Sequence, residues 1–193
     1  MTLGLRAAGF SDVGTFRASN QDSAFTAPWA AAVADGVGGG PAGDIASAAL
    51  VHRLAAGLHG PVTAPQLLTR VREANWDLRA HVRRDPALDG MATTFTGVFS
   101  TPDDRLVLAH TGDSRAYLLR EGAMSRQTRD DSFVQVLVDR GLVSVEEAAS
   151  HPHRNIITSS LHGADEDVVT VGEVDAHLGD RWLLCSDGVS DYL

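Results

Sequence analysis

The order of apolar and polar positions predicts short strands in the first part of the chain. Strands are expected at Phe10–Phe16 and Ser23–Thr26, where apolar residues lie between polar turn residues. The segment Trp29–Ala34 is apolar throughout, which is typical of a strand buried on both faces. The glycine-rich stretch Gly36–Gly43 then interrupts the pattern and marks a loop.

Two helices are predicted next, because apolar residues recur at helical spacing. The first begins near Asp44, a candidate N-cap or first-turn acid, and its apolar stripe comprises Leu50, Val51, Leu54, Ala55 and Leu58. The second begins near Ala64-Pro65, since proline is tolerated in the first helical turn, and ends at Asp85-Pro86. Its apolar face comprises Leu67, Leu68, Val71, Ala74, Asn75, Leu78 and Val82.

The second half of the chain predicts further strands around one more helical region. Thr93–Phe99 and Arg105–His110 indicate a hairpin, and Arg115–Leu119 indicates a third strand. Residues 131–150 are expected to be helical, with the capping-box pair Ser144 and Glu147. Strands close the chain at 167–174 and 181–185. Because strands and helices do not alternate regularly, the pattern favours an α+β fold of antiparallel sheets covered by helices.

Composition narrows the class of protein. With 193 residues, of which 44% are hydrophobic, the chain has the length and apolar content of one globular domain. Sixteen basic residues stand against 25 acidic ones, a formal net charge of -9, so we expect no nucleic acid as partner. All the basic residues are arginine, which excludes a lysine nucleophile or Schiff base.

The lone cysteine and the absence of apolar spans indicate a location. Cys185 is the only cysteine, so no intrachain disulfide can form, and we expect a reducing compartment, the cytoplasm. Its place in an apolar run indicates a buried, inert thiol rather than a nucleophile. The chain does not open with a secretory leader and holds no run long enough to span a bilayer, so we expect no membrane segment.

Acidic corners that follow apolar runs are the candidate chemistry. Asp35-Gly36 follows Ala30–Ala34, Asp187-Gly188 follows Trp182–Cys185, and Asp113 follows Leu106–Gly112. A carboxylate at the end of a buried strand, with glycine beside it, can reach a ligand without crowding from neighbouring side chains. Carboxylates are the ligands of hard cations, so converging corners would hold Mg²⁺ or Mn²⁺ rather than Zn²⁺.

Two such ions form a clamp for hydrolysis at phosphorus. An arginine would complete the site, because its planar fork matches phosphate oxygens, and Arg17 lies close in sequence to a further carboxylate, Asp22. Each feature alone has a plainer interpretation. A single apolar-Asp-Gly corner is more often a structural turn, and Arg17 alone is more often a surface residue. The hypothesis therefore depends on their joint occurrence and order.

That order resembles the successive motifs of the PPM/PP2C family of metal-dependent serine/threonine protein phosphatases, in its bacterial type. The resemblance covers essentially the whole chain. The matching segments are Arg17-x-x-Asn20-Gln21-Asp22, Ala34-Asp35-Gly36-Val37-Gly38-Gly39, Gly90-Met91-Ala92-Thr93-Thr94, Gly112-Asp113-Ser114-Arg115, His151–Thr158 and Ser186-Asp187-Gly188.

The resemblance implies a fold and a reaction. The fold would be a four-layer α-β-β-α sandwich of two antiparallel sheets flanked by helix pairs, with a flap at about 128–161 beside the site. A water that bridges two metal ions would attack phosphoserine or phosphothreonine directly, without a phosphoenzyme. The substrate would be a phosphorylated protein, the target of a bacterial Ser/Thr kinase, and we expect a monomer.

The resemblance also implies roles for individual residues. Asp35 would bridge two Mn²⁺ or Mg²⁺ ions, and the Gly36 carbonyl and Asp187 would each bind one of them. Asp22 would act through metal-bound water, and Asp113 would hold a third ion together with Asp187. Arg17 would grip the substrate phosphate. Asp35, Asp187 and Arg17 would be the catalytic residues.

Three departures from the family pattern leave an alternative open. Val37 stands where some relatives carry a histidine proposed to protonate the leaving group, and Asp130-Asp131 places an extra negative charge in the flap. The chain stops at Leu193, whereas the family continues through a helix to an Asp-Asn strand that ligates the same metal as Asp187. We therefore expect residues 1–193 to form one domain truncated before that helix and strand. The alternative is an impaired pseudophosphatase or a phosphoprotein-binding module. A small-molecule phosphohydrolase is a weaker rival, which the flap-like segment disfavours.

Overall fold

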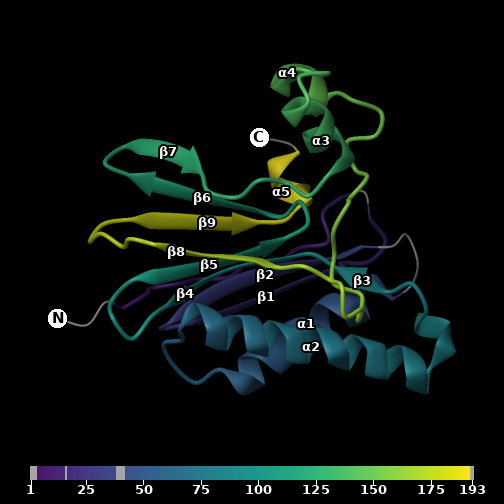
Figure 1. The fold of residues 1–193 in the computed structure, drawn as a ribbon, viewed down its shortest axis with the longest axis horizontal. Coiled ribbons are helices and arrows are strands. Elements are labelled where there is room, and N and C mark those ends of the chain that lie inside the picture. Colours follow the sequence, from purple (N-terminus) through teal and green to yellow (C-terminus); the bar gives the residue numbers. More distant parts are fainter. Residues whose placement is uncertain (1–3, 16, 38–41, 192–193) are drawn as a thin grey trace.

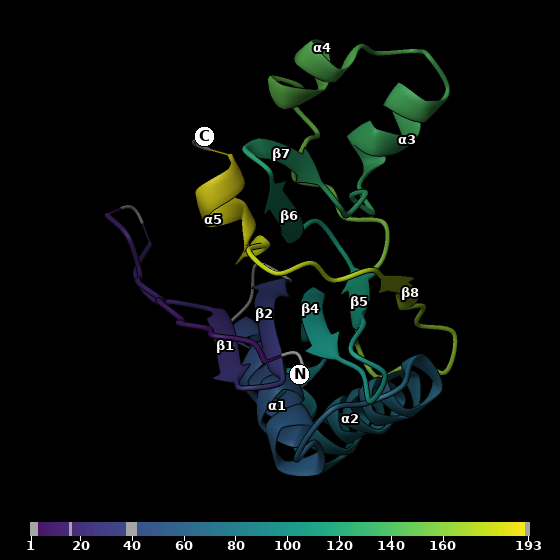
Figure 2. The ribbon, with the colours of Figure 1, turned by 90° about the vertical axis from the view of Figure 1, so that its left-hand side faces the viewer.

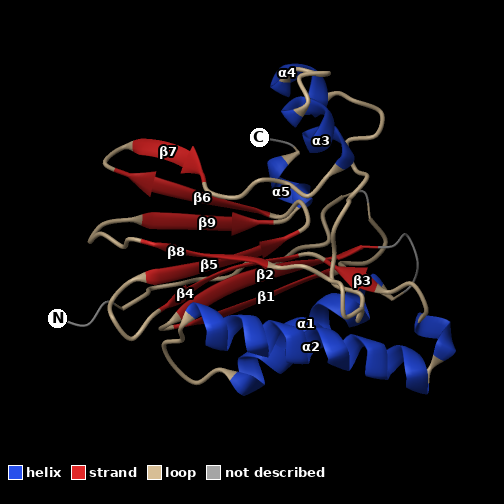
Figure 3. Cartoon of the chain, in the orientation of Figure 1, coloured by secondary structure: helices blue, strands red, loops and turns tan. Residues whose placement is uncertain are grey.

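A computed structural model describes residues 4–15, 17–37 and 42–191. Within them the elements follow one another as strands, two long helices, strands, two short helices and strands (Figure 3). The elements are β1 (Asp22–Ala27), β2 (Ala30–Val37), α1 (Gly43–Gly57), α2 (Ala64–Arg84), the 3-10 turn Pro86–Leu88, β3 (Ala92–Thr93), β4 (Phe95–Ser100), β5 (Leu106–Thr111), β6 (Arg115–Arg120), β7 (Ala123–Arg126), α3 (Phe133–Asp139), α4 (Val145–Ala149), β8 (Thr170–Val174), β9 (Arg181–Cys185) and α5 (Asp187–Ser190).

The strands form two antiparallel sheets. The first has the order β1-β2-β4-β5-β8, with β3 paired to the end of β2. The second has the order β7-β6-β9. Figure 2 shows the first sheet as a row from β1 to β8, with α1 and α2 beneath it and β6 and β7 on its other side. The predicted α+β class with antiparallel sheets is confirmed.

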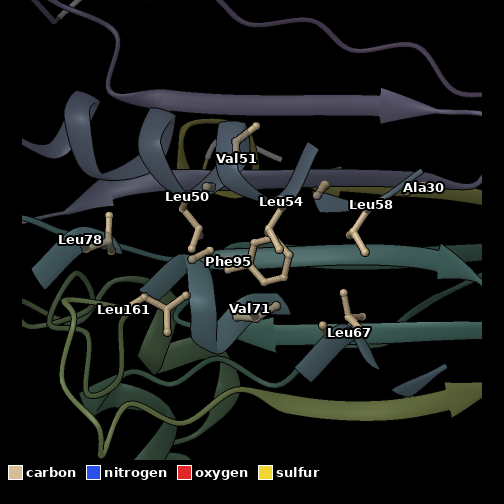
Figure 4. Close-up of a cluster of buried hydrophobic side chains, with 14 of the residues drawn as sticks. Ala30, Leu50, Val51, Leu54, Leu58, Leu67, Val71, Leu78, Phe95 and Leu161 are labelled. Carbon is tan, nitrogen blue, oxygen red and sulfur yellow. The ribbon is translucent and has the colours of Figure 1, made fainter. Parts of the chain in front are cut away.

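The main hydrophobic core lies between the first sheet and the helix pair. Leu50 and Leu54 of α1, Val71 of α2 and Phe95 of β4 are among its fully buried members (Figure 4). Burial of each such side chain contributes about 1.5–3 kcal/mol, so this interface is the main support of the first sheet. The second sheet packs against the face of the first sheet that points away from α1 and α2. Within the described residues, these two long helices cover the first sheet and not the second (Figure 1).

The two long helices confirm the predicted apolar stripes and differ in how they begin. Asp44 is a first-turn acid of α1 and not its N-cap, which is Ala42 without a side-chain cap. The N-cap of α2 is Thr63, whose hydroxyl accepts from the Gln66 amide while the Gln66 side chain accepts from the Thr63 amide. This capping box, together with Pro65 in the first turn, fixes the start of α2.

The predicted strand Phe10–Phe16 is wrong for the residues that the structure describes. Residues 10–15 contain no strand and are exposed, and Phe10 is 89% exposed. Phe16 itself, like Gly38 and Gly39 of the glycine-rich stretch, lies outside the described residues. An alternating pattern predicts a strand only where a partner strand and a buried face are available.

The predicted helical region 131–150 consists of two short helices separated by a turn. Gly141 in that turn has a φ of 66°, a left-handed conformation that glycine adopts without strain. The capping box of Ser144 and Glu147 is present at the start of α4. Together with their flanking loops, α3 and α4 form a projection that stands away from both sheets (Figure 2). None of the helices in the described part of the chain is long and apolar enough to cross a membrane.

Candidate functional site

Four acidic side chains that are remote in sequence line one cavity. Asp22, Asp35, Asp113 and Asp187 all contribute to the walls of a cavity of about 1570 Å³. Asp22 and Asp35 face each other across the β1–β2 pair. Asp113 follows β5 and Asp187 begins α5 directly after β9, so both sheets supply carboxyl groups. The fold therefore gathers the predicted acidic corners into one place.

Two threonines hold the backbone of Asp35. Its amide donates to Thr94 Oγ1 at 2.9 Å, and its carbonyl oxygen accepts from the Thr94 amide at 2.8 Å and from Thr93 Oγ1 at 3.0 Å. Thr93 and Thr94 are completely buried, so water does not compete with these bonds. The end of β2 is thereby fixed, and the Asp35 side chain starts from a defined position.

Glycine is required next to Asp35 because the start of α1 lies against it. A Cβ atom built on Gly36 would stand only 2.1 Å from the carbonyl oxygen of Gly43. This contact is with backbone rather than with a movable side chain, so no larger residue fits. Gly36 also lines the cavity.

Ser186 connects the two sheets at the site. Its hydroxyl donates to Asp22 Oδ2 at 2.6 Å, although the two residues are 164 positions apart. Ser186 is buried and immediately precedes Asp187. This bond therefore sets the position of β1 relative to the start of α5, and it orients the Asp22 carboxylate.

The Asp113 loop is held by Asp131, which lies just before α3. Gly112 has a φ of 97°, and a Cβ atom there would stand 2.6 Å from Thr94 Cγ2. The Gly112 amide donates to Asp131 Oδ2 at 3.0 Å, and its carbonyl accepts from the Asp131 amide at 2.7 Å. Asp113 is thus carried on a loop whose conformation only glycine permits.

The surroundings of the acidic cluster disfavour the ionised form of its carboxyl groups. Burial, followed by the charges of Asp22, Asp187 and Asp113, raises the pKa of Asp35 far above its ordinary value, and a hydrogen bond to Asp187 adds to the shift. Burial and the Asp187 charge raise the pKa of Asp113 to about 7. A divalent cation would offset this repulsion, so the donor set fits a hard cation.

The carboxyl groups are nevertheless not arranged as a closed metal cage. Across residues 4–15, 17–37 and 42–191, no three His, Cys, Asp or Glu side chains are placed to hold one metal ion between them. The arrangement fits ions that use one or two carboxylates each and take backbone oxygen or water as further ligands.

Arg17 lies on the exposed wall of the same cavity, just before β1. Arg17 is an exposed residue, so an anionic ligand that enters the cavity can approach it. This placement suits the predicted phosphate contact. It equally suits the plainer interpretation of Arg17 as a surface residue, because a phosphate contact and a surface position both require an exposed side chain.

In the fold, Asp130 is paired with two arginines and Asp131 is bound by a backbone amide. Asp130 is buried and pairs with Arg115 at 2.8 Å and with Arg126 at 2.9 Å. The Asp131 carboxylate accepts from the Gly112 amide. These carboxyls attach the segment just before α3 to the second sheet and to the Asp113 loop.

Several residues at the site carried no assigned role in the sequence. Thr93 and Thr94 belong to a motif that resembled the family, yet only the structure shows that they bind the Asp35 backbone. Ser186 likewise had no role, because a bond to Asp22 cannot be read from positions so far apart. Arg154, in the loop after α4, also lines the cavity, and its Nε lies 3.7 Å from Asp191 Oδ2.

Known proteins resemble this chain in both sequence and structure. A family model described as protein phosphatase 2C matches residues 17–193. The serine/threonine protein phosphatase PstP of Mycobacterium tuberculosis is 46% identical over 196 residues, which is 99% of this chain and 37% of PstP. The chain therefore spans well under half the length of that relative.

Solved structures match the fold closely. The crystal structure of the Mycobacterium tuberculosis phosphatase PstP/Ppp has a TM-score of 0.93 at 44% identity and covers 99% of this chain and 82% of its own. The catalytic domain of PstP in complex with two manganese ions has a TM-score of 0.89 at 42% identity, over 100% of this chain and 81% of its own. At these identities the likeness concerns sequence family as well as fold.

Proposed function

Because the chain belongs to the protein phosphatase 2C family, we propose that it hydrolyses phosphoserine and phosphothreonine in proteins with the help of divalent metal ions. The observation that carries this proposal is the convergence of Asp22, Asp35, Asp113 and Asp187 on one cavity whose wall also holds Arg17. Carboxylates would hold the cations, and an arginine beside them would bind the phosphate.

The metal ligands proposed are those that the family resemblance implies. Asp35, the Gly36 carbonyl and Asp187 would hold two ions, Asp22 would act through water, and Asp113 with Asp187 would hold a third. The raised pKa values of Asp35 and Asp113 support this set, because they reflect buried acids without a counter-charge. The manganese ions in the PstP complex support Mn²⁺, and Mg²⁺ has the same preference for oxygen ligands.

Bound ions would act as Lewis acids that lower the pKa of water and screen the charge of the phosphoryl group. The chain itself supplies position and charge. Arg17 would bind the phosphate oxygens, Ser186 orients Asp22, and Thr93 with Thr94 fixes Asp35. These contacts place the acids before the substrate arrives, so little reorganisation is needed during the reaction.

Water is the nucleophile that this site favours. The water oxygen would form the new bond to phosphorus while the bond between phosphorus and the serine or threonine oxygen breaks. The leaving serine or threonine oxygen would take up a proton. Burial raises the pKa of the Cys185 thiol, which disfavours a thiolate nucleophile. Val37 carries no titratable group, so the proton for the leaving oxygen must come from water or from another group of the cavity.

Further parts of the proposal concern the setting. We take residues 1–193 to act as one catalytic domain, with the flap at about 128–161 beside the cavity. The substrates would be proteins phosphorylated by a bacterial Ser/Thr kinase, and the protein would act as a monomer in the cytoplasm. The names of the relatives support phosphoprotein substrates, and a single buried thiol suits a reducing compartment.

Hydrolysis of a phosphothreonine peptide in the presence of Mn²⁺ tests the proposal. We expect turnover that EDTA abolishes and that Asp35→Asn lowers by at least about 100-fold, because even indirect metal partners cost 10- to 100-fold. Asp89→Asn, an exposed acid outside the cavity, is the matched control and should retain full turnover.

The outcomes separate the proposal from its alternative. Equal metal-dependent turnover in Asp35→Asn and the wild type would remove the role of Asp35. Binding of the phosphopeptide without any turnover would instead support a binding-only pseudophosphatase. Turnover of small aryl phosphates alone, with phosphopeptides untouched, would support a small-molecule phosphohydrolase.

A further inference from the structure

A buried histidine links the flap to the strands that carry the acidic cluster. His110 of β5 is only 5% exposed, and both of its ring nitrogens have partners. Nε2 lies 2.9 Å from the carbonyl oxygen of Arg129 at the root of the flap, and Nδ1 lies 2.9 Å from Thr96 Oγ1 on β4. A carbonyl oxygen only accepts, so Nε2 must carry the hydrogen of that bond.

The hydrogen bonds continue from Thr96 to the acidic cluster. Thr96 Oγ1 also lies 2.8 Å from the Ser114 carbonyl, so its single hydrogen is shared between that oxygen and Nδ1 of the neutral imidazole. Ser114 directly follows Asp113. The Ser114 hydroxyl lies 2.7 Å from Thr94 Oγ1, which accepts from the Asp35 amide at 2.9 Å. One unbroken series of contacts therefore runs from the Arg129 carbonyl to the backbone of Asp35.

This series is sheltered from solvent. His110, Thr96, Ser114 and Thr94 are all buried, and three of the four are completely inaccessible. Buried polar groups that lose a partner incur their full desolvation cost, because no water replaces the missing bond. Each member of the series therefore has one favoured position, and displacing one member disturbs the next.

The flap root is attached to the same strands by a second set of contacts. Asp131 exchanges hydrogen bonds with Gly112, and the Thr158 amide, on the returning side of the flap, donates to the Asp131 carbonyl at 2.8 Å. Both ends of the flap thus meet at the loop that carries Asp113. The His110 contact extends this attachment into the interior toward β4. At the returning end of the flap, Leu161 pairs with Thr93 of β3, which binds the Asp35 carbonyl.

We propose that His110 is a positioning residue that ties the root of the flap, residues 127–131, to the loop of Asp113 and the end of β2 at Asp35. Through it the placement of the flap and the geometry of the acidic cluster are set together. Its consequence for turnover rests on the proposed phosphatase function, whereas the structural linkage itself does not.

Amide hydrogen exchange in the metal-free protein tests the linkage without any need for activity. Thr96→Val removes the hydroxyl that joins His110 to Ser114 and keeps the shape of the side chain. Thr111→Val is the matched control, because Thr111 is also a completely buried strand threonine but its hydroxyl has no partner among the described residues. His110→Gln and His110→Leu complete the set, since only glutamine can still donate toward Arg129.

We expect Thr96→Val and His110→Leu to exchange roughly fivefold faster or more at residues 112–114 and 127–131, the effect of losing one buried hydrogen bond. Thr111→Val should exchange like the wild type, and His110→Gln should recover part of the protection at 127–131. With an aryl phosphate and Mn²⁺, we expect Thr96→Val to lower kcat while KM stays unchanged, because the acids shift and Arg17 does not.

Identical exchange in Thr96→Val and Thr111→Val at both segments would overturn the proposal. If His110→Leu does not fold, as judged by its thermal unfolding, Thr96→Val and His110→Gln still decide the matter. A wild-type protein without turnover would contradict the proposed function, yet the exchange experiment would still support or reject the role of His110.

Discussion

The carboxyl group of Asp35 shows at the scale of one residue why this cavity calls for a cation. Burial raises the pKa of this group most, and the nearby charges of Asp22, Asp187 and Asp113 raise it further. Evolution toward stability alone would replace such a buried acid by a neutral residue, because an unpaired buried charge is costly. Its presence beside other acids is explained when the group serves a positively charged ligand.

Arg17 is a positively charged residue on the wall of the acidic cavity, and its proposed role can be tested by mutation. We expect Arg17→Ala to raise KM for a phosphothreonine peptide roughly tenfold or more, the effect of losing a charged hydrogen bond, with a smaller change in kcat. The physical reason is that a phosphate grip acts on the bound substrate as well as on the transition state. Steady-state kinetics with Mn²⁺ measure both constants.

Arg72→Ala, which removes an exposed arginine of α2 outside the cavity, is the control for the change in net charge. Its KM should equal that of the wild type. An unchanged KM in Arg17→Ala would show that Arg17 is no more than a surface residue.

Among the elements, β2 and α1 do most to define the site. The Asp35 end of β2 is pinned by Thr93 and Thr94, and the start of α1 presses its Gly43 backbone against Gly36. Because α1 also packs on the first sheet through Leu50 and Leu54, the position of the site depends on the main hydrophobic core. A change in this contact should therefore alter both stability and the site.

We expect Gly36→Ala to destabilise the protein by about 1–3 kcal/mol or more, since its methyl group would collide with backbone that cannot move aside. Urea unfolding monitored by circular dichroism measures the loss. Gly172→Ala is the matched control, because Gly172 is also a strand glycine but a Cβ atom there meets nothing within 4 Å. Equal stabilities of the two variants would refute the close approach of β2 and α1.

Much of this element structure could be predicted from the sequence, and the failures have physical causes. The apolar run before Asp35 and the stripe that includes Leu50 and Leu54 predicted β2 and α1, because burial imposes those patterns. The strand β7, with its four exposed residues, leaves no such pattern. The stretch Phe10–Phe16 has a strand-like pattern, but its described residues have no partner strand.

The aspartates of the candidate site could be predicted from the sequence, but the residues that hold them in place could not. Asp35, Asp113 and Asp187 were identifiable because each follows an apolar run. The hydroxyls of Thr94 and Ser186 were not, because their bonds to Asp35 and Asp22 join segments that only the tertiary fold brings together. Likewise, nothing local indicated that Asp130 would be neutralised by Arg115 and Arg126.

For the whole molecule, the sandwich concentrates negative charge at one cavity, and the stability of the metal-free protein should reflect this. The pKa of Asp113 is raised from 3.8 to about 7, so the folded state binds its proton more tightly than the unfolded chain does. That stabilising contribution is complete below the unfolded pKa and is lost as the pH rises through about 7.

We therefore expect Asp113→Asn, measured in EDTA by thermal unfolding, to be more stable than the wild type at pH 8 and to lose that advantage as the pH falls toward the unfolded pKa of aspartate. The comparison with the variant cancels His110, whose lowered pKa makes stability rise with pH and so has the opposite sign. A stability difference that does not change with pH would contradict the predicted environment of Asp113.

Calorimetric titration of Mn²⁺ into the wild type and Asp35→Asn is the most direct test of the central claim, that remote carboxylates converge to bind divalent cations. We predict saturable binding of at least two ions per wild-type chain and severely weakened binding in Asp35→Asn, with Asp89→Asn unaffected. The absence of saturable Mn²⁺ binding by the wild type, or equal binding by Asp35→Asn, would contradict the claim.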